Sequence, residues 1–262
     1  MKRLITVIGI LLTLLAGPSW AVEPINLALA PAILGGAGAG GAAAPAGCCG
    51  GTSYLLCENF DGSSACYSGD ATYNICDGTW TAIGSPTFVF NYATSPAPLE
   101  GSYSVHLAST TETGTGYSKS FTENDTVHFF YIFNAHKRSA ASLSAKILAA
   151  DDTVLMTVSN AGYEWSIYCG TILGYSTTMA VDTTYYVWGD YTKGNGVNTA
   201  VCHLFHSTDT TKGSADITVT NGDAAAKKAG KFVMNQPSVV ANDDYIFDKI
   251  RVSTSSIGDN PN

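Results

Sequence analysis

The ten residues 244–253 (Asp-Tyr-Ile-Phe-Asp-Lys-Ile-Arg-Val-Ser) alternate with the period of a β-strand, and they constrain the fold more than any other stretch. Period two puts one set of side chains on one face, namely Ile246, Ile250 and Val252, and the other set on the opposite face, namely Tyr245, Phe247, Lys249 and Arg251. Asp248 then falls on the aliphatic face, where a carboxylate is costly unless it is paired or bound to a cation. The stretch therefore predicts a late strand whose carboxylate finds a partner elsewhere in the domain.

Similar short strands recur through the chain. The chain has 262 residues, of which 45% are hydrophobic and only 13% are charged. Apolar alternation bounded by Gly, Pro, Asn and Asp predicts strands at 54–61, from 80, and at 87–92, 102–108, 117–121, 126–134, 143–149, 154–159, 163–169, 184–193, 199–206, 216–220 and 231–235. This spacing predicts an all-β protein of two packed antiparallel sheets, a jelly-roll β-sandwich, with one short helical turn at 224–229.

The charge balance excludes one class of partner. The formal net charge is -8, and the 13 Lys and Arg residues are scattered along the sequence. Nucleic-acid binding needs clustered Lys and Arg, so we expect no nucleic-acid partner.

The N-terminus predicts export. Lys2 and Arg3 precede an apolar run, and Ser19-Trp20-Ala21 is a small-x-small cleavage site, so residues 1–21 are expected to be a secretory signal peptide. An uncleaved membrane anchor is the alternative. Residues 22–52 form a Gly/Ala-rich apolar linker or anchoring arm, 53–256 the β-sandwich and 257–262 a tail. We therefore expect a secreted or cell-surface protein.

Seven cysteines are compatible with an oxidising compartment. Spacing suggests that Cys66 pairs with Cys76, and that Cys169 pairs with Cys202 across a sheet. Three cysteines would then be left over, namely Cys48, Cys49 and Cys57. The connectivity stays open at this point. Zinc is the competing interpretation, but no CxxC pair stands opposite a second pair or two spaced His residues.

Four segments, in this order, resemble the concanavalin A-like, laminin-G-like jelly-roll superfamily. They are Glu-Asn-Phe-Asp at 58–61, Pro-Leu-Glu-Gly-Ser-Tyr-Ser-Val-His-Leu at 98–107, Tyr-Tyr-Val-Trp-Gly-Asp-Tyr at 185–191 and Phe-Asp-Lys-Ile-Arg-Val at 247–252. The resemblance covers roughly residues 54–254. It implies that the first and last strands lie close together.

The resemblance also implies a structural calcium ion, which many members of the superfamily hold near these strands. The matching positions are Glu58, the backbone carbonyl of Gly101, and Asp248. Period two independently puts both carboxylates on apolar faces, where oxygen ligation of a hard cation would remove the desolvation cost. The alternative is that Lys249, Arg251 or backbone amides satisfy the carboxylates.

Catalysis has little support in the sequence. Glycosidases of this superfamily carry Glu-x-Asp-x-x-Glu on one strand, and this chain has neither that run nor a Gly-x-Ser-x-Gly elbow. His128 and Tyr131 are three apart, which places them on opposite faces of a strand. We therefore expect a non-catalytic protein, with polysaccharide degradation as a lesser alternative.

The favoured hypothesis is a carbohydrate-binding or adhesion module that recognises a glycan at a surface. Sugar binding would use exposed aromatic faces, and the candidates are Trp165, Tyr168, Tyr175, Tyr186 and Trp188. Any of these residues can instead belong to the core. The alternative hypothesis is a structural protein of a filament, cell surface or virion that self-assembles through the N-terminal arm.

Overall fold

Apolar residues at alternate strand positions face each other between two antiparallel sheets. The computed structural model describes residues 54–58, 60, 74–75, 78–83, 88–92, 97–101, 104–108, 115–137, 143–160, 163–196, 198–236 and 244–261. All of them belong to the second of two units, 40–262. The expected signal peptide and arm (1–52), and four cysteines (Cys48, Cys49, Cys66 and Cys76), lie outside the described residues.

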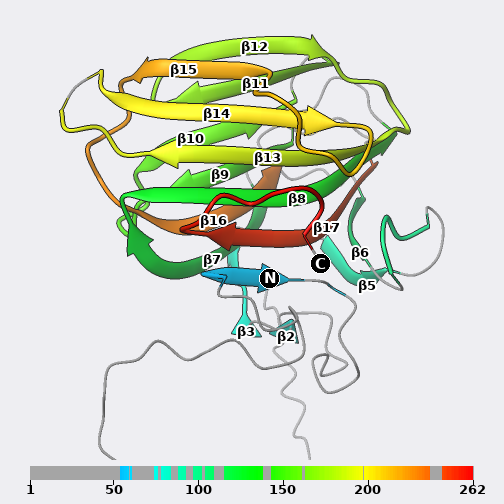
Figure 1. The fold of residues 1–262 in the computed structure, drawn as a ribbon. Helices are drawn as coiled ribbons and strands as arrows, with labels where there is room; N and C mark the ends of the chain where they lie inside the picture. The colour runs from blue at the N-terminus through cyan, green and yellow to red at the C-terminus, as the bar shows by residue number, and fades with distance from the viewer. Residues whose placement is uncertain are drawn as a thin grey trace, which may run out of the picture. The chain divides into compact units, whose positions relative to one another are not determined.

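Two large sheets form the domain (Figure 1). Within the described residues, the eight-stranded sheet has the order β15 (Ile217–Gly222), β14 (Ala200–Ser207), β13 (Thr184–Thr192), β8 (Thr126–Lys137), β17 (Asp244–Ser253), β6 (Ser104–Ala108) and β5 (Phe88–Tyr92), with β1 (Leu56–Glu58) also pairing with β17. The seven-stranded sheet has the order β12 (Ile172–Thr178), β11 (Glu164–Cys169), β10 (Val154–Ser159), β9 (Ser144–Leu148), β16 (Ala229–Gln236), β7 (Thr115–Asn124) and β4 (Thr81–Ile83). A small ribbon joins β2 (Asn74–Ile75) to β3 (Gly78–Thr79). The predicted two-sheet antiparallel jelly-roll β-sandwich is confirmed.

Strand β8 illustrates how the sequence builds this arrangement. Phe129, Tyr131 and Phe133 point into the core between the sheets. Phe130 and Ile132 belong to a second, smaller apolar cluster on the outer side of the same sheet. Both faces of β8 are therefore covered, as its two-sided apolar sequence predicts. Among the described residues, none forms a helix with the length and apolarity of a membrane span.

Strand β17 joins the two ends of the domain but departs from the predicted phase. It pairs with β1 in the register Glu58↔Ile250, so the first and last strands are adjacent. Lys249 has a φ of 49°, and the pairing of β17 with β8 shifts between Asp248 and Arg251. This β-bulge inserts one residue and reverses the alternation. As a result the residues that reach the main core are Tyr245, Phe247, Ile250 and Val252, which corrects the predicted division of faces.

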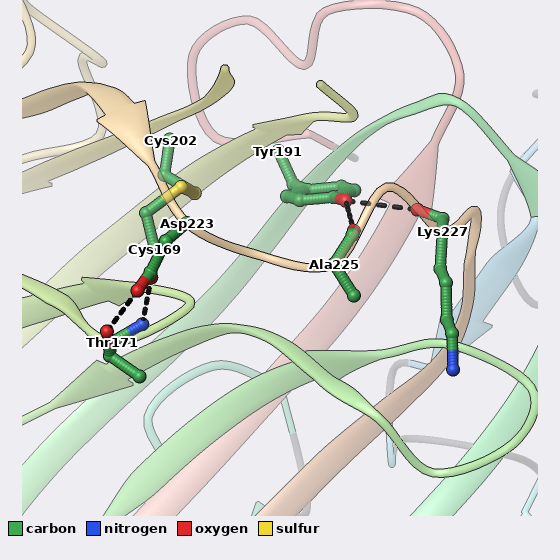
Figure 2. Close-up of a disulfide and its surroundings, with 7 residues drawn as sticks. All are labelled: Cys169, Thr171, Tyr191, Cys202, Asp223, Ala225 and Lys227. Carbon is green, nitrogen blue, oxygen red and sulfur yellow. Dashed lines mark hydrogen bonds between the residues drawn. A yellow bond between two sulfur atoms is a disulfide. The ribbon is translucent and has the colours of Figure 1, made fainter. Parts of the chain in front are cut away.

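Two other local predictions are corrected. Strand β12 was not predicted, and its Gly174 packs so closely that an added Cβ would lie 2.6 Å from Cγ2 of Ile217. The segment 223–228 is irregular, not a helical turn. A carbonyl of this segment accepts a side-chain hydrogen bond instead: the Tyr191 hydroxyl donates to the carbonyl of Lys227 at 3.0 Å (Figure 2).

A disulfide between Cys169 on β11 and Cys202 on β14 connects the two sheets (Figure 2). The sequence predicted this pair, although within one sheet and not between two. The Cα atoms are 5.8 Å apart, and the two cysteines close a separation of 33 residues. Cys57, which the sequence left without a partner, is also disulfide-bonded. The predicted Cys66–Cys76 bond lies outside the described residues.

Candidate functional site

The outer face of the seven-stranded sheet, here called the open face, is built by simple alternation. On β9, Ala145 and Ile147 enter the core, which directs Lys146 outward. On β16, Phe232 and Met234 enter the core, and Val233 points outward beside Lys146. Side chains directly opposite on neighbouring strands lie on the same face, about 4.5–5.5 Å apart at Cβ.

Strand pairing continues this arrangement into a row that crosses the whole sheet. Each of the seven strands, taken across the sheet in the spatial order β4, β7, β16, β9, β10, β11 and β12, contributes one directly opposed residue. These residues are Thr81, Ser118, Val233, Lys146, Thr157, Tyr168 and Leu173. A second row beside it runs through Ile83, Gly116, Asn235, Ser144, Ser159, Ser166 and Tyr175. The open face thus ends in two exposed tyrosines, whereas Ser144, Ser159 and Ser166 in its second row are buried.

These two tyrosines are among the predicted ligand-binding residues, and the fold brings them together. Tyr168 is 36% exposed on β11 and Tyr175 is 64% exposed on β12. Ser166 lies directly opposite Tyr175 and two residues before Tyr168, so the tyrosines are diagonal cross-strand neighbours. Two exposed aromatic rings side by side form a surface suited to stacking against a ligand.

The other end of the open face holds a pocket of about 390 Å³, here called the Lys146 pocket. Its volume is within the range of small-molecule sites. Its apolar walls are Ile83, Leu148, Val154 and Val233, and its polar lining is Thr81, Ser118, Lys146, Asp152, Lys231 and Asn235. Sequence reasoning did not identify this pocket, because the residues come from five strands and one turn and meet only through strand register.

The two lysines of the pocket differ electrostatically. Lys231 forms an ion pair with Asp152 in the β9–β10 turn. Among the described residues, none forms a hydrogen bond or ion pair with the Lys146 ammonium. Burial lowers the pKa of Lys146 from its ordinary value. The pocket therefore contains a partly desolvated cation without a counter-ion among the described residues.

The three remaining aromatic residues that were predicted to bind a ligand are buried or half-buried, unlike Tyr168 and Tyr175. Trp165 is 1% exposed in the main core, where it stacks on His206 at 5.4 Å. Trp188 is fully buried, and its Nε1 donates to the carbonyl of Gly258 at 2.8 Å. Tyr186 is half-buried in the outer cluster with Trp188. The expectation of an exposed ring is therefore corrected for Trp165 and Trp188, because both indoles pack inside the protein.

The outer face of the eight-stranded sheet is here called the covered face. Residues 254–261, from here on called the tail in place of the predicted 257–262, pack against it and bury Trp188 (Figure 1, red). Ile257 joins the apolar cluster of Phe130, Ile132 and Trp188. Hydrogen bonds fix the end of the tail: Asn260 N donates to Thr210 O at 2.7 Å, and Lys212 N donates to Asp259 Oδ1 at 3.0 Å.

A polar row lies on the covered face and was also missed by sequence reasoning. Asp190 on β13 is directly opposite His128 on β8 and His203 on β14. Asp190 Oδ1 lies 2.7 Å from His128 Nδ1 and 3.6 Å from Lys212 Nζ. Burial raises the pKa of Asp190, but the hydrogen bond with His128 and the nearby cations outweigh it, so the pKa lies below its ordinary value. An Asp that orients a His through Nδ1 leaves Nε2 able to exchange a proton with a ligand.

The residues predicted to hold calcium do not fit one ion site. Glu58 pairs with the core residue Ile250 and accepts a hydrogen bond from Trp80 Nε1 at 3.2 Å, so it faces the core. Asp248 follows the core residue Phe247 and faces the other side of the sheet. The two carboxylates therefore do not converge.

Asp248 is instead surrounded by donors. Its Oδ2 accepts hydrogen bonds from Glu100 N at 3.0 Å and Ser104 Oγ at 2.8 Å, and its Oδ1 accepts one from Lys249 N at 2.8 Å. A lone pair that accepts an N–H or O–H is not free for a cation. No group of three or more His, Cys, Asp or Glu suited to a metal ion occurs among the described residues. Calcium binding stays a prediction from sequence.

The comparisons with known proteins do not assign a family. No family model matches the chain, and no curated protein matches it. Structures of similar fold include the catalytic domain of a glycoside hydrolase family 131 protein from Coprinopsis cinerea, with 10% identity, a TM-score of 0.49, and coverage of 80% of this chain and 100% of that one. They also include the CBM22-1 xylan-binding domain from Paenibacillus barcinonensis Xyn10C, with 12% identity, a TM-score of 0.39, and coverage of 79% and 97%.

A third similar structure is a sialidase, with 9% identity and a TM-score of 0.48. The match covers 63% of this chain but only 16% of the sialidase. At such identities and TM-scores, the neighbours do not discriminate between the possible functions of this chain. The case for function therefore depends on its own residues.

Proposed function

We propose that the protein binds carbohydrate through its open face. The observation that carries this proposal is the adjacent pair of exposed tyrosines, Tyr168 and Tyr175, at one end of that face. A sugar ring presents apolar C–H groups to an aromatic face and hydroxyl groups to its surroundings. Aromatic surface with a few placed polar groups is the common composition of small-ligand sites.

The remaining features of the chain support an extracellular setting for this binding. The Cys169–Cys202 disulfide is compatible with an oxidising compartment. The predicted signal peptide at 1–21 and the arm at 22–52 would direct the domain outside the cell and tether it there. We propose adhesion to a surface glycan as the role of the tethered domain.

The test is binding of the full chain to a panel of immobilised polysaccharides, with single alanine variants. Tyr168→Ala and Tyr175→Ala should each weaken binding at least about tenfold, which is about 1.4 kcal/mol. Tyr163→Ala is the matched control, because Tyr163 is 38% exposed but precedes β11 and lies outside the pair. Unchanged affinity in both tyrosine variants, or binding to none of the polysaccharides, would overturn the proposal.

A second candidate function is polysaccharide cleavage, which the His128–Asp190 pair on the covered face favours. A carboxylate-oriented imidazole is a common general base. Purified protein incubated with the same polysaccharides should then release reducing or unsaturated ends, and His128→Ala should abolish the release. Binding without any release of ends would leave carbohydrate recognition as the function.

A further inference from the structure

Lys146 lies on the same cross-strand row as Tyr168, and Tyr175 lies on the neighbouring row. Lys146 on β9 is opposite Thr157 on β10, and Thr157 is opposite Tyr168 on β11. Two strand spacings of about 4.8 Å therefore separate the lysine from the first tyrosine along the row. A ligand chain that stacks on Tyr168 and continues along the row passes Thr157 and then reaches the pocket.

The charges that face Lys146 select the kind of group the pocket takes. The pocket-lining residues of β16 and the β9–β10 turn supply Lys231 and Asp152, which form an ion pair with each other. The pocket-lining residues of β4, β7 and β10 are uncharged, namely Thr81, Ile83, Ser118 and Val154. Among the described residues that line the pocket, a single positive charge, that of Lys146, is left for a ligand. Asp152 opposes a group with more than one negative charge.

Asn235 adds a neutral donor beside this cation. Its Oδ1 accepts the hydroxyl hydrogen bond of Ser144, which leaves the Nδ2 amide as its donor. Asn235 is opposite Ser144, two residues before Lys146, so the amide and the lysine are diagonal neighbours. A carboxylate has two acceptor oxygens and one negative charge, which matches one ammonium and one amide.

We propose that the Lys146 pocket binds the carboxylate of an acidic sugar, a uronic acid unit of the glycan that stacks on Tyr168 and Tyr175. The carboxylate supplies the counter-ion of the half-buried ammonium, and Asn235 donates to its second oxygen. The apolar walls, formed in part by Leu148 and Val233, contact the C–H face of the same sugar ring. This inference rests on the proposed carbohydrate binding and names its substrate class.

The experiment is calorimetric titration of the full chain with three acidic oligosaccharides, a galacturonan, an alginate and a glucuronoxylan. Each is paired with its carboxyl-reduced, neutral counterpart of the same length. At least one acidic form should bind about tenfold or more tightly than its counterpart. Lys146→Met should remove this difference while leaving the neutral form unaffected, and Lys146→Arg, which keeps the charge, should retain most of it.

The outcomes separate this inference from the proposal on which it rests. Equal affinity for acidic and neutral forms, with loss of both in Tyr175→Ala, would overturn the acidic-sugar assignment and leave carbohydrate binding intact. Loss of both forms in Lys146→Met would also overturn it, since the lysine would then act on the fold and not on the charge. No binding to any of the six oligosaccharides or to the polysaccharide panel would overturn both proposals. The melting temperature of each variant shows whether it is folded.

Discussion

The outer faces of both sheets carry aromatic residues that point away from the main core, but the two faces differ in whether another part of the chain covers these residues. On the covered face, Phe130, Ile132 and Trp188 point away from the main core, and the tail residue Ile257 closes over them. On the open face, Tyr168 and Tyr175 also point away from the core and remain exposed. An outward-pointing aromatic residue thus indicates a binding surface only where no other part of the chain covers it.

The largest expected effect is the loss of stability when the carboxylate of Asp248, on the covered face, is removed. Asp248→Ala removes the acceptor for Glu100 N, Ser104 Oγ and Lys249 N. We expect it to lower the free energy of unfolding by about 3–5 kcal/mol, the range for breaking a buried, hydrogen-bonded charge. Chemical denaturation measures the change. Glu164→Ala, at an exposed acid on β11, is the control and should stay within about 0.5 kcal/mol of wild type. A similarly small loss for Asp248→Ala would show that the carboxylate does not hold this face together.

Removing the tail should have the next largest effect. Truncation after Ser256 removes Ile257 and the hydrogen bond of Trp188 to Gly258. Burial of an Ile contributes about 1.5–3 kcal/mol, and the hydrogen bond about 0.5–1.5 kcal/mol. We expect a loss of about 2–4 kcal/mol and a red shift of tryptophan fluorescence.

The matched control is truncation after Asp259, which keeps Ile257 and Gly258. It should retain the wild-type emission maximum and most of the stability. If glycan affinity is unchanged in the shorter truncated protein, the two faces are functionally separate. A large gain or loss of affinity would show that the covered face takes part in binding.

The pH dependence of acidic-glycan binding tests the role of Lys146 on the open face. Burial lowers the pKa of Lys146 below 10.5, and a bound carboxylate favours the charged lysine. Affinity should therefore be full below the pKa of Lys146 and fall as the pH rises through it, by up to about tenfold per unit. Lys146→Arg should abolish this decline. A profile that is flat up to pH 10.5 in the wild type would contradict the role of Lys146.

The same group has the opposite influence on the ligand-free protein. Its pKa is lower in the folded state than in the unfolded state, so the unfolded state binds more protons between the two values. The contribution of Lys146 to the free energy of unfolding should therefore rise with pH in that window. Comparison of wild type with Lys146→Met by denaturation at several pH values measures it.

The smallest expected effect concerns calcium. Because both acceptor positions of Asp248 Oδ2 are engaged by Glu100 and Ser104, we expect a chelator to leave the melting temperature unchanged. Calcium added back serves as the control. A reversible drop of several degrees in chelator would favour the calcium ion that the sequence predicts.

The sequence predicts the sandwich because alternation and turn residues agree along most of the chain. It does not predict the phase of β17, because the bulge at Lys249 depends on pairing with two neighbouring strands. It also does not predict β12. Gly174 weakens the strand signal there, although the close packing against Ile217 requires a glycine at this position.

The candidate site shows the same division. Alternation along the predicted strand at 163–169 separates Tyr168 from Trp165 and Ile167, but Tyr175 lies on β12, which the sequence does not predict. Trp188 also lies on a predicted strand, and the tail covers it. Lys146 gives no local signal at all. Its neighbours Val233 and Asp152 are distant in sequence or in a turn, and only the strand register brings them together.

The most direct test of the binding face is a nuclear magnetic resonance titration of the ¹⁵N-labelled chain with the tightest-binding glycan. If the open face binds, the largest backbone shifts should occur at Lys146, Thr157, Tyr168 and Tyr175, and those of the covered face should not move. Shifts centred on His128, Asp190 and His203, with the open face unchanged, would contradict the assignment.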